Sequence, residues 1–141
     1  MLRLFPLLLI PIVIYNLLAL GGGAIAHHNV QDLTKASFEI TMFSKDKWSI
    51  NLEDFFLLSG LALLFIETIK ATRTTSNELI NHGLSMLVFV GALIEFITVP
   101  GFATSTFFFL MLFALFDVVS GYTISIVAAE HDLGLGKAGT D

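Results

Sequence analysis

The sequence contains no cysteine, so disulfide bonds, thiolate metal ligands and cysteine nucleophiles are excluded. Charged residues are scarce as well, at 13% of the chain, and they form neither a basic patch for nucleic acid nor a polybasic cluster for anionic lipids. Nucleotide-binding motifs, a nucleophile with its base and a paired set of metal ligands are also missing from the sequence. We therefore expect no catalytic site, no cofactor, no metal and no nucleic-acid partner.

Apolar residues are abundant instead. Hydrophobic residues make up 55% of the 141 positions, and the mean hydropathy is +0.85, which is typical of a membrane protein. A helix needs ~17 to 25 apolar residues to cross a bilayer. Four segments are near or above that length, namely 4–20, 52–69, 79–99 and 102–129. The sequence therefore predicts an all-α membrane protein, a bundle of four transmembrane helices in one domain over 1–141.

The ends of these segments carry helix signals. Asn51, followed by Glu53 and Asp54, is typical of an N-cap with acidic residues in the first turn. Pro100 and Gly101 end the third segment and turn the chain tightly into the fourth, so we expect the third and fourth helices to form an antiparallel pair. The fourth segment is too long for an upright span, and it should tilt or extend past the interface.

The outer loop, residues 21–51, contains an alternating pattern. Residues 38–42 read FEITM and residues 48–50 read WSI, so apolar and polar side chains alternate on both sides of SKDK. This period of two predicts a short β-hairpin over 37–51, with an irregular loop as the alternative. A lone hairpin is marginal in water. Its apolar face should therefore rest on the end of the bundle, dip into the interface through Trp48, or pair with a partner.

Basic residues set the expected orientation. Lys70 and Arg73 lie in a very short connection, where the positive-inside rule is most reliable. We therefore expect both termini on the cytoplasmic side and the hairpin outside. The first segment has a second interpretation as a cleaved secretory signal, because Ala24 and Ala26 lie at small-residue positions after its apolar run. The length of that run and the presence of Pro11 favour retention of the segment.

Polar residues inside the apolar segments are the candidate functional residues, and they are Asn16, Glu67, His82, Glu95 and Asp117. A charge at the bilayer centre costs at least ~2.5 to 3.5 kcal/mol, so such side chains usually face the interior of the bundle and pair there. Glu67 has Lys70 three residues later on the same helical face, which predicts an ion pair near the cytoplasmic end. His82 lies at the same level and could touch Glu67, but as the sole histidine in a span it cannot supply both axial ligands of a haem.

Glu95 lies near the outer end of the third segment. It could accept hydrogen bonds from Thr104, Ser105 or Thr106 and so clamp the third helix to the fourth. Glu95 and His82 are 13 residues apart, which at ~100° per residue places them on different helical faces. They are therefore not one site on one stripe.

Asp117 is the deepest of these residues, within the run TFFFLMLFALFDVVSGYTISI at 106–126. Ser120 and Gly121 lie near its helical face, where small residues let helices approach closely and a hydroxyl can bond to an acid. We expect Asp117 to face the interior of the bundle or a protein partner, with Ser120, Ser85 and Asn16 as candidates for hydrogen bonding. A structural role in helix packing and a functional role as a proton or ion site both remain open.

The residues 70–96, KATRTTSNELINHGLSMLVFVGALIEF, and 103–126, ATSTFFFLMLFALFDVVSGYTISI, resemble a family of small bacterial four-span inner-membrane proteins of unassigned function. The resemblance covers helices two to four. It implies four spans and a place in the bacterial inner membrane, and it implies no catalytic role.

Two functions are in competition. The favoured one is a non-enzymatic accessory or scaffold subunit that binds itself, as a homo-oligomer, or a larger membrane complex. The alternative is an oligomeric transporter or proton- or cation-conducting protein that uses Asp117, Glu67 and His82. A membrane enzyme acting on lipid or quinone is a third and weaker interpretation. A conduction pathway requires a polar stripe that continues across the membrane, which separates these classes.

Overall fold

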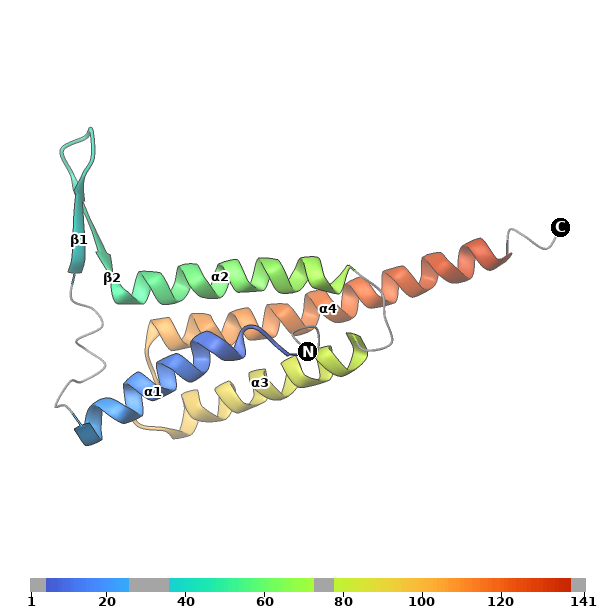
Figure 1. Cartoon of the computed structure of the whole chain (residues 1–141), viewed down its shortest axis with the longest axis horizontal. Coiled ribbons are helices and arrows are strands. Elements are labelled where there is room, and N and C mark those ends of the chain that lie inside the picture. Colours follow the sequence, from blue (N-terminus) through green and yellow to red (C-terminus); the bar gives the residue numbers. More distant parts are fainter. Residues whose placement is uncertain (1–4, 26–35, 73–77, 138–141) are drawn as a thin grey trace.

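The computed structural model describes residues 5–25, 36–72 and 78–137. These residues form four helices and a two-stranded antiparallel sheet, as the sequence predicts. The elements in chain order are α1 (Leu9–Ile25), β1 (Ala36–Thr41), β2 (Lys47–Asn51), α2 (Leu52–Ala71), α3 (Glu78–Thr98) and α4 (Ser105–Lys137) (Figure 1).

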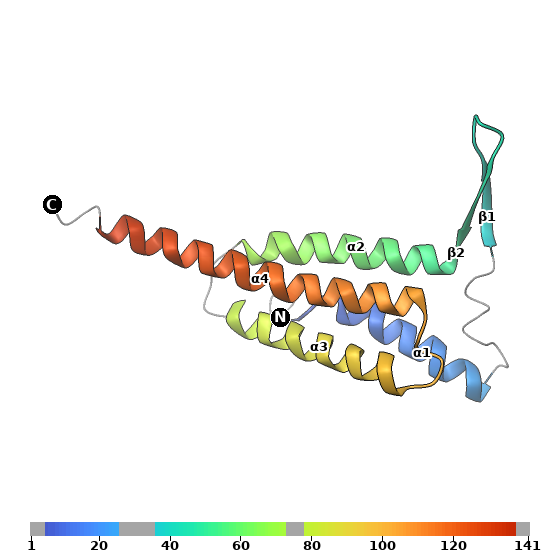
Figure 2. The same cartoon turned by 180° about the vertical axis from the view of Figure 1, so that it is seen from behind.

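The helices lie side by side, and α4 packs against both α2 and α3 (Figures 1 and 2). α3 and α4 run antiparallel, as expected from the turn between them, where Gly101 has a φ of 89°. This left-handed conformation favours glycine because it has no Cβ. α1 contacts all three of the other helices, and the buried apolar core lies where the four meet.

Two helix starts follow local capping chemistry. The Asn51 N–H donates a 2.7 Å hydrogen bond to the carboxylate of Asp54, which fixes the first turn of α2 as the sequence predicts. The Thr104 hydroxyl accepts a 3.2 Å hydrogen bond from the Phe107 N–H, which makes Thr104 the N-cap of α4.

Four predicted boundaries differ from the observed helix ends. α1 begins at Leu9 and not at residue 4, because Pro6 and Leu7 form a turn whose carbonyls accept the first hydrogen bonds of the helix. It continues through the three glycines at 21–23, which the sequence assigns to the outer loop. α4 starts later than the predicted residue 102, at Ser105, and ends at Lys137, well past residue 129. Glycine is frequent within helices of apolar, membrane-spanning segments, so these three glycines do not end α1.

Within the described part of the chain, two helices contain stretches that are long and apolar enough to cross a membrane, Ile80–Thr98 and Ser105–Glu130. The apolar part of α1 is shorter, at Leu9–Leu20. α2 has acidic residues in its first turn and Glu67 and Lys70 near its end, which lowers its mean hydropathy. These findings are compatible with membrane association, and two helices pass the length and composition test.

The outward faces of the helices are strongly apolar. Large exposed side chains occur on every helix, for example Leu17 on α1, Phe65 on α2, Leu87 and Ile97 on α3, and Ile126 on α4. A soluble protein of this size seldom exposes such a continuous apolar surface. Lipid would cover it without cost, which fits helices placed in a bilayer.

Candidate functional site

Polar side chains, most of them buried, gather between α2, α3 and α4, near the end of the bundle where α2 stops and α3 begins. We refer to them as the inner cluster, and its members are Glu67, Lys70, Asn81, His82, Ser85, Asp117 and Ser125. Four of the six predicted site residues therefore lie together: Asp117, Glu67, His82 and Ser85. Ser120 lies one turn from Asp117 on α4 and lines a groove between α2 and α4. Glu95 lies apart from the inner cluster, beside Asn16.

Glu67 is the centre of one half of the inner cluster, and its side chain is 1% exposed. One of its oxygens, Oε1, accepts from Asn81 Nδ2 at 2.8 Å and from Lys70 Nζ at 2.8 Å. The other oxygen, Oε2, accepts a long 3.5 Å hydrogen bond from the Leu7 N–H. Lys70 also donates to the Phe5 carbonyl at 3.2 Å. The expected ion pair with Lys70 is present, and this one carboxylate joins α2, α3 and the segment before α1.

His82 forms the opposite half of the inner cluster. Its Nε2 lies 3.2 Å from the Ser125 hydroxyl, and its ring centroid is 5.6 Å from that of Tyr122. The ring lies directly over the backbone of Gly121, where any Cβ would collide with the imidazole. The expectation that Gly121 permits a close helix approach is correct, although the group that approaches is a histidine side chain. His82 therefore binds α3 to α4.

Asp117 faces the interior of the bundle, as expected, and is 1% exposed. The Ser85 hydroxyl lies beside its carboxyl group. In this conformation neither Ser85 Oγ nor Asp117 Oδ2 completes a hydrogen bond with another described residue. Among the candidates, Ser85 is therefore the hydroxyl that lies next to the Asp117 carboxyl group.

Two other expected partners of Asp117 are wrong. The Ser120 hydroxyl donates a 3.2 Å hydrogen bond to the Asp117 backbone carbonyl and not to its carboxyl group, because Ser120 lies three residues later on the same helix. Asn16 lies at the other end of the bundle, where its amide donates to Glu95 at 2.9 Å.

The residues around Glu95 form a second group, which we refer to as the outer cluster: Tyr15 and Asn16 on α1, Glu95 on α3, and Thr104 before α4. The predicted clamp of Glu95 on Thr104, Ser105 or Thr106 is wrong, because Asn16 of α1 is its partner and the Thr104 hydroxyl pairs with Tyr15 at 2.7 Å. The rotation of α3 about its axis directs Glu95 toward Asn16 of α1 and not toward the start of α4. Glu95 therefore clamps α3 to α1.

An apolar layer separates the two clusters. It contains buried side chains from α1, α2, α3 and α4, namely Ile12, Phe56, Ala92, Phe107, Leu110, Met111 and Ala114. Among the described residues, no polar side chain within this layer connects the inner cluster to the outer one. Over the same part of the chain, no group of three histidine or carboxylate side chains is close enough to hold a metal ion.

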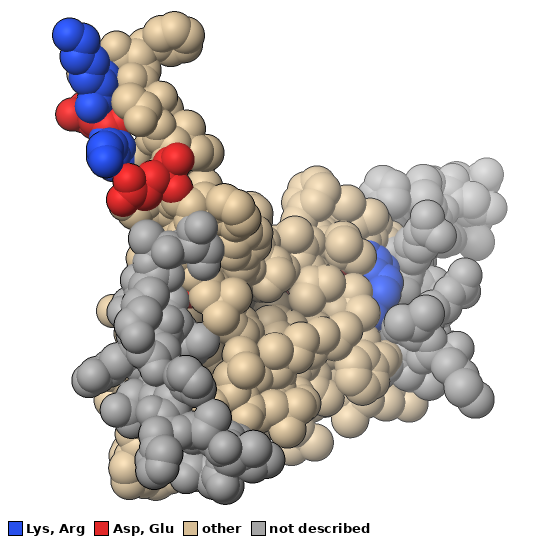
Figure 3. Space-filling view, turned by 60° about the vertical axis from the view of Figure 1, so that its left-hand side comes forward, with Lys and Arg blue, Asp and Glu red and all other residues tan. Residues whose placement is uncertain are grey.

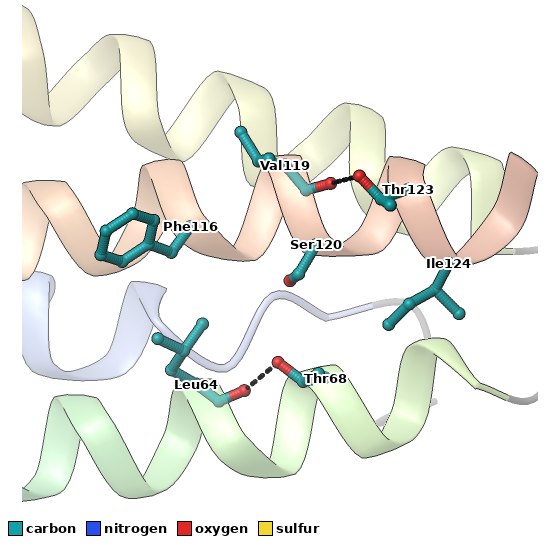
Figure 4. Close-up of a pocket in the computed structure, with 7 residues that line it drawn as sticks. All are labelled: Leu64, Thr68, Phe116, Val119, Ser120, Thr123 and Ile124. Atoms are coloured by element: carbon teal, nitrogen blue, oxygen red, sulfur yellow. Dashed lines mark hydrogen bonds between the residues drawn. The ribbon is translucent and has the colours of Figure 1, made fainter. Parts of the chain in front are cut away.

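A groove of about 440 Å³ runs between α2 and α4 on the outer surface of the bundle (Figure 4). Its lining is mostly apolar, with Leu64 and Phe116 among the contributors. Its two threonines direct their hydroxyls to their own helices, since Thr68 donates to the Leu64 carbonyl at 2.9 Å and Thr123 to the Val119 carbonyl at 2.7 Å. The groove therefore offers few free hydrogen-bonding groups to a soluble ligand.

Comparison with protein-family models, with curated proteins and with solved structures finds no match. The resemblance of residues 70–96 and 103–126 to small bacterial four-span inner-membrane proteins therefore stays a prediction.

Sequence reasoning missed Asn81 and the pairing of Tyr15 with Thr104. Asn81 precedes His82 in the same apolar segment, at the same level as Glu67, so its amide was visible as a potential donor. Tyr15 precedes Asn16 and is fully buried, with its ring 5.6 Å from Phe56 and 5.1 Å from Phe107. Because Tyr15 is one of many aromatic residues in the chain, its sequence context did not single out its hydroxyl as a hydrogen-bonding group.

Proposed function

We propose that this chain is a four-span, non-enzymatic membrane protein, an accessory or scaffold subunit that binds a second copy of itself or a larger membrane complex. The helices α3 and α4 support the membrane placement by their length and apolar character. α2 adds to it, because residues 55–66 are uncharged and a 20-residue helix is about 30 Å long, the thickness of the hydrocarbon layer.

The contacts of α1 support its role as the remaining span. Its Tyr15 and Asn16 bond to Thr104 and Glu95, and the Leu7 N–H before it reaches Glu67. Loss of α1 would leave these buried or half-buried groups without partners, which is costly in a low-dielectric environment. These contacts favour a retained first helix over a cleaved signal.

The observation that carries the scaffold assignment is the apolar layer between the inner and outer clusters. The carboxylates and amides of each cluster are used in contacts between helices, as with Asn81 to Glu67 and Asn16 to Glu95. Polar groups used in this way stabilise a bundle, whereas a pathway would need them to continue through the layer. This arrangement supports a structural subunit over a conducting one.

The orientation with both termini cytoplasmic is part of the proposal. The N-terminal end of α1 points toward the end of the bundle opposite the hairpin, and α4 extends past that end (Figure 1). Lys70 lies at that end, which the positive-inside rule places in the cytoplasm. The resemblance to small bacterial four-span proteins supports an inner-membrane location.

Native purification tests the proposed class. The full chain would be extracted in a mild detergent, and the mass of the intact particle measured by native mass spectrometry. A discrete assembly of fixed stoichiometry, either several copies or one copy with a larger membrane protein, is expected. A monomer that carries ions across reconstituted vesicles would contradict the scaffold assignment.

One observation favours the alternative, an oligomeric proton- or cation-conducting protein. Asp117 Oδ2 and Ser85 Oγ are buried and complete no hydrogen bond with another described residue, and such groups are often functional inside membranes. Proton or cation flux into vesicles that contain the purified chain, abolished by Asp117→Asn in a variant that still assembles, would establish this alternative.

A further inference from the structure

The two-stranded hairpin formed by β1 and β2 stands apart from the four helices. In Figures 1 and 2 its strands run across the direction of the helices and extend sideways beyond α2. If the helices cross a bilayer, the strands lie along the plane of its outer interface. The hairpin does not rest on the end of the bundle, which was one of the expectations from the sequence.

Its turn holds the hairpin in a defined shape. The Met42 N–H donates to the Asp46 carbonyl at 2.9 Å, and the Lys45 N–H donates to the Met42 carbonyl at 2.9 Å. Lys45 has a φ of 72°, as in a three-residue hairpin loop that ends in a left-handed residue. The Ser44 hydroxyl donates to the Asp46 carboxylate at 2.8 Å. These bonds place Phe43 at the tip, fully exposed.

The strand register gives the hairpin one apolar and one polar face. Phe38 pairs with Ile50, and Ile40 pairs with Trp48. Neighbouring residues on a strand point to opposite faces, so the polar face carries Glu39, Thr41, Lys47 and Ser49. An ion pair of 3.2 Å between Lys47 and Glu39 lies on this polar face.

The apolar face is open. Phe38 is 62% exposed and Trp48 is 52% exposed. No described residue of the bundle covers them. A two-stranded hairpin with such a face is marginal in water and needs a surface to pack against.

Figure 3 shows which way the two faces point. The charged side chains of the hairpin gather on the side that looks away from the end of the bundle. The opposite side, which overhangs the surface of α2, is uncharged. That part of α2 presents exposed apolar side chains, including Phe55 and Leu58. The apolar face of the hairpin and the outer surface of α2 therefore border the same region beside the bundle, and lipid would fill that region.

We propose that the hairpin is a lateral membrane anchor, which lies flat on the outer leaflet beside α2 with its apolar face in the boundary between headgroups and acyl chains. This inference rests on the proposed membrane-spanning bundle. The occupant of the open face is lipid. Trp48 has the amphipathic ring that is typical of this boundary, and Phe43 at the tip enters it farthest from the bundle.

The charge of the hairpin specifies the kind of lipid contact. Residues 38–51 contain two acidic side chains, Glu39 and Asp46, and two basic ones, Lys45 and Lys47, so their formal charges cancel. Attraction to anionic headgroups therefore contributes little, and burial of apolar surface provides the driving force. The anchor should bind zwitterionic and anionic bilayers equally well, with little dependence on salt.

The hairpin contains the single tryptophan of the chain, which makes the test direct. The full-length protein would be reconstituted in phosphatidylcholine vesicles with lipids brominated either near the headgroup or near the chain end. Trp48 fluorescence is expected to be quenched strongly by the shallow bromines, weakly by the deep ones, and little by aqueous iodide. Quenching by iodide with no quenching by either lipid would overturn the anchor.

A second reporter separates this proposal from the one on which it rests. In a Trp48→Phe background, Leu87→Trp places the tryptophan on the exposed face of α3, where deep bromines should quench it. Deep quenching at position 87 without shallow quenching at position 48 would reject the anchor and leave the spanning bundle intact. Absence of quenching at position 87 would reject the bundle itself.

Matched variants test the two faces. Phe38→Ser on the apolar face should remove most of the shallow quenching of Trp48, whereas Thr41→Ser on the polar face should leave it unchanged. Equal effects would contradict the proposed orientation. A second copy of the chain is the competing occupant: if protection of Trp48 from iodide disappears as the protein is diluted in lipid, the face binds another copy and the anchor is wrong.

Discussion

Asn81 on α3 donates a 2.8 Å hydrogen bond to the carboxylate of Glu67 on α2, and both side chains are buried. The same oxygen of Glu67 accepts from Lys70 at 2.8 Å. Hydrogen bonds to an ionised acceptor are stronger than those between neutral groups. This contact therefore fixes the register between α2 and α3 at the inner end of the bundle.

Two substitutions of Glu67 should distinguish the effect of losing its charge from the effect of losing its hydrogen bond with Asn81. Glu67→Gln keeps an acceptor for Asn81 and should retain most of the thermal stability in detergent. Glu67→Leu leaves the buried Asn81 amide without its acceptor, which costs about 1–3 kcal/mol. Thermal unfolding monitored by circular dichroism measures both variants. Equal melting temperatures for the two would show that this contact contributes little.

Asp117 should tolerate an amide and not an alkyl group. Asp117→Asn retains a polar group of similar size beside Ser85, so assembly should be nearly normal. Asp117→Leu leaves the Ser85 hydroxyl in an apolar environment and should weaken assembly. Size-exclusion chromatography in mild detergent compares the two. If both variants assemble like the unmodified chain, the carboxyl group has no role in packing.

Gly121→Ala should destabilise the bundle, because the new Cβ would collide with the His82 imidazole. The ring would have to leave its position between Ser125 and Tyr122, and overpacking of this kind costs about 1–3 kcal/mol. Gly91→Ala on α3 is the matched control, since nothing lies within 4 Å of its added Cβ. The control should melt no lower than the unmodified chain. A similar loss in both variants would indicate a general effect of alanine.

The hydrogen bond between Tyr15 and Thr104 can be measured by a double-mutant cycle. Tyr15→Phe removes the hydroxyl and keeps the ring in contact with Phe56 and Phe107. We expect a loss of about 0.5–1.5 kcal/mol for Tyr15→Phe. Thr104→Val also removes the N-cap hydrogen bond from the Phe107 N–H in both backgrounds, so its cost should be smaller in the Tyr15→Phe background but should not vanish. Chemical unfolding in detergent provides the free energies. Additive losses would mean that the two hydroxyls do not interact.

Topology can be read from single cysteines, since the chain has none of its own. Ser44→Cys lies in the hairpin turn, and Glu130→Cys lies on the part of α4 beyond α2. A membrane-impermeant maleimide applied to intact cells should label the first and not the second, and both should react after the cells are opened. Labelling in the opposite order would reverse the proposed orientation.

The sequence predicts the elements of this fold better than their contacts. Long apolar segments and a period-two pattern are local signals, so four helices and the hairpin over 37–51 are correct. The levels of Glu67, His82 and Asp117 follow from counting along each helix. The rotation of one helix against another depends on packing across the whole bundle, which no local pattern contains. For this reason Glu95 has Asn16 as its partner instead of Thr104.

Because α4 is longer than α2, its far end should amplify small movements at the inner end of the bundle. Its 33 residues correspond to about 50 Å, against about 30 Å for the 20 residues of α2. α4 therefore continues beyond the end of α2, as Figure 2 shows. From Gly121 to Lys137 the helix is about 24 Å long, so a tilt of about 10° at the contact between His82 and Gly121 would move its far end by about 4 Å. A displacement of that size exceeds a hydrogen-bond length, so a small change between α3 and α4 becomes a detectable movement outside the bundle.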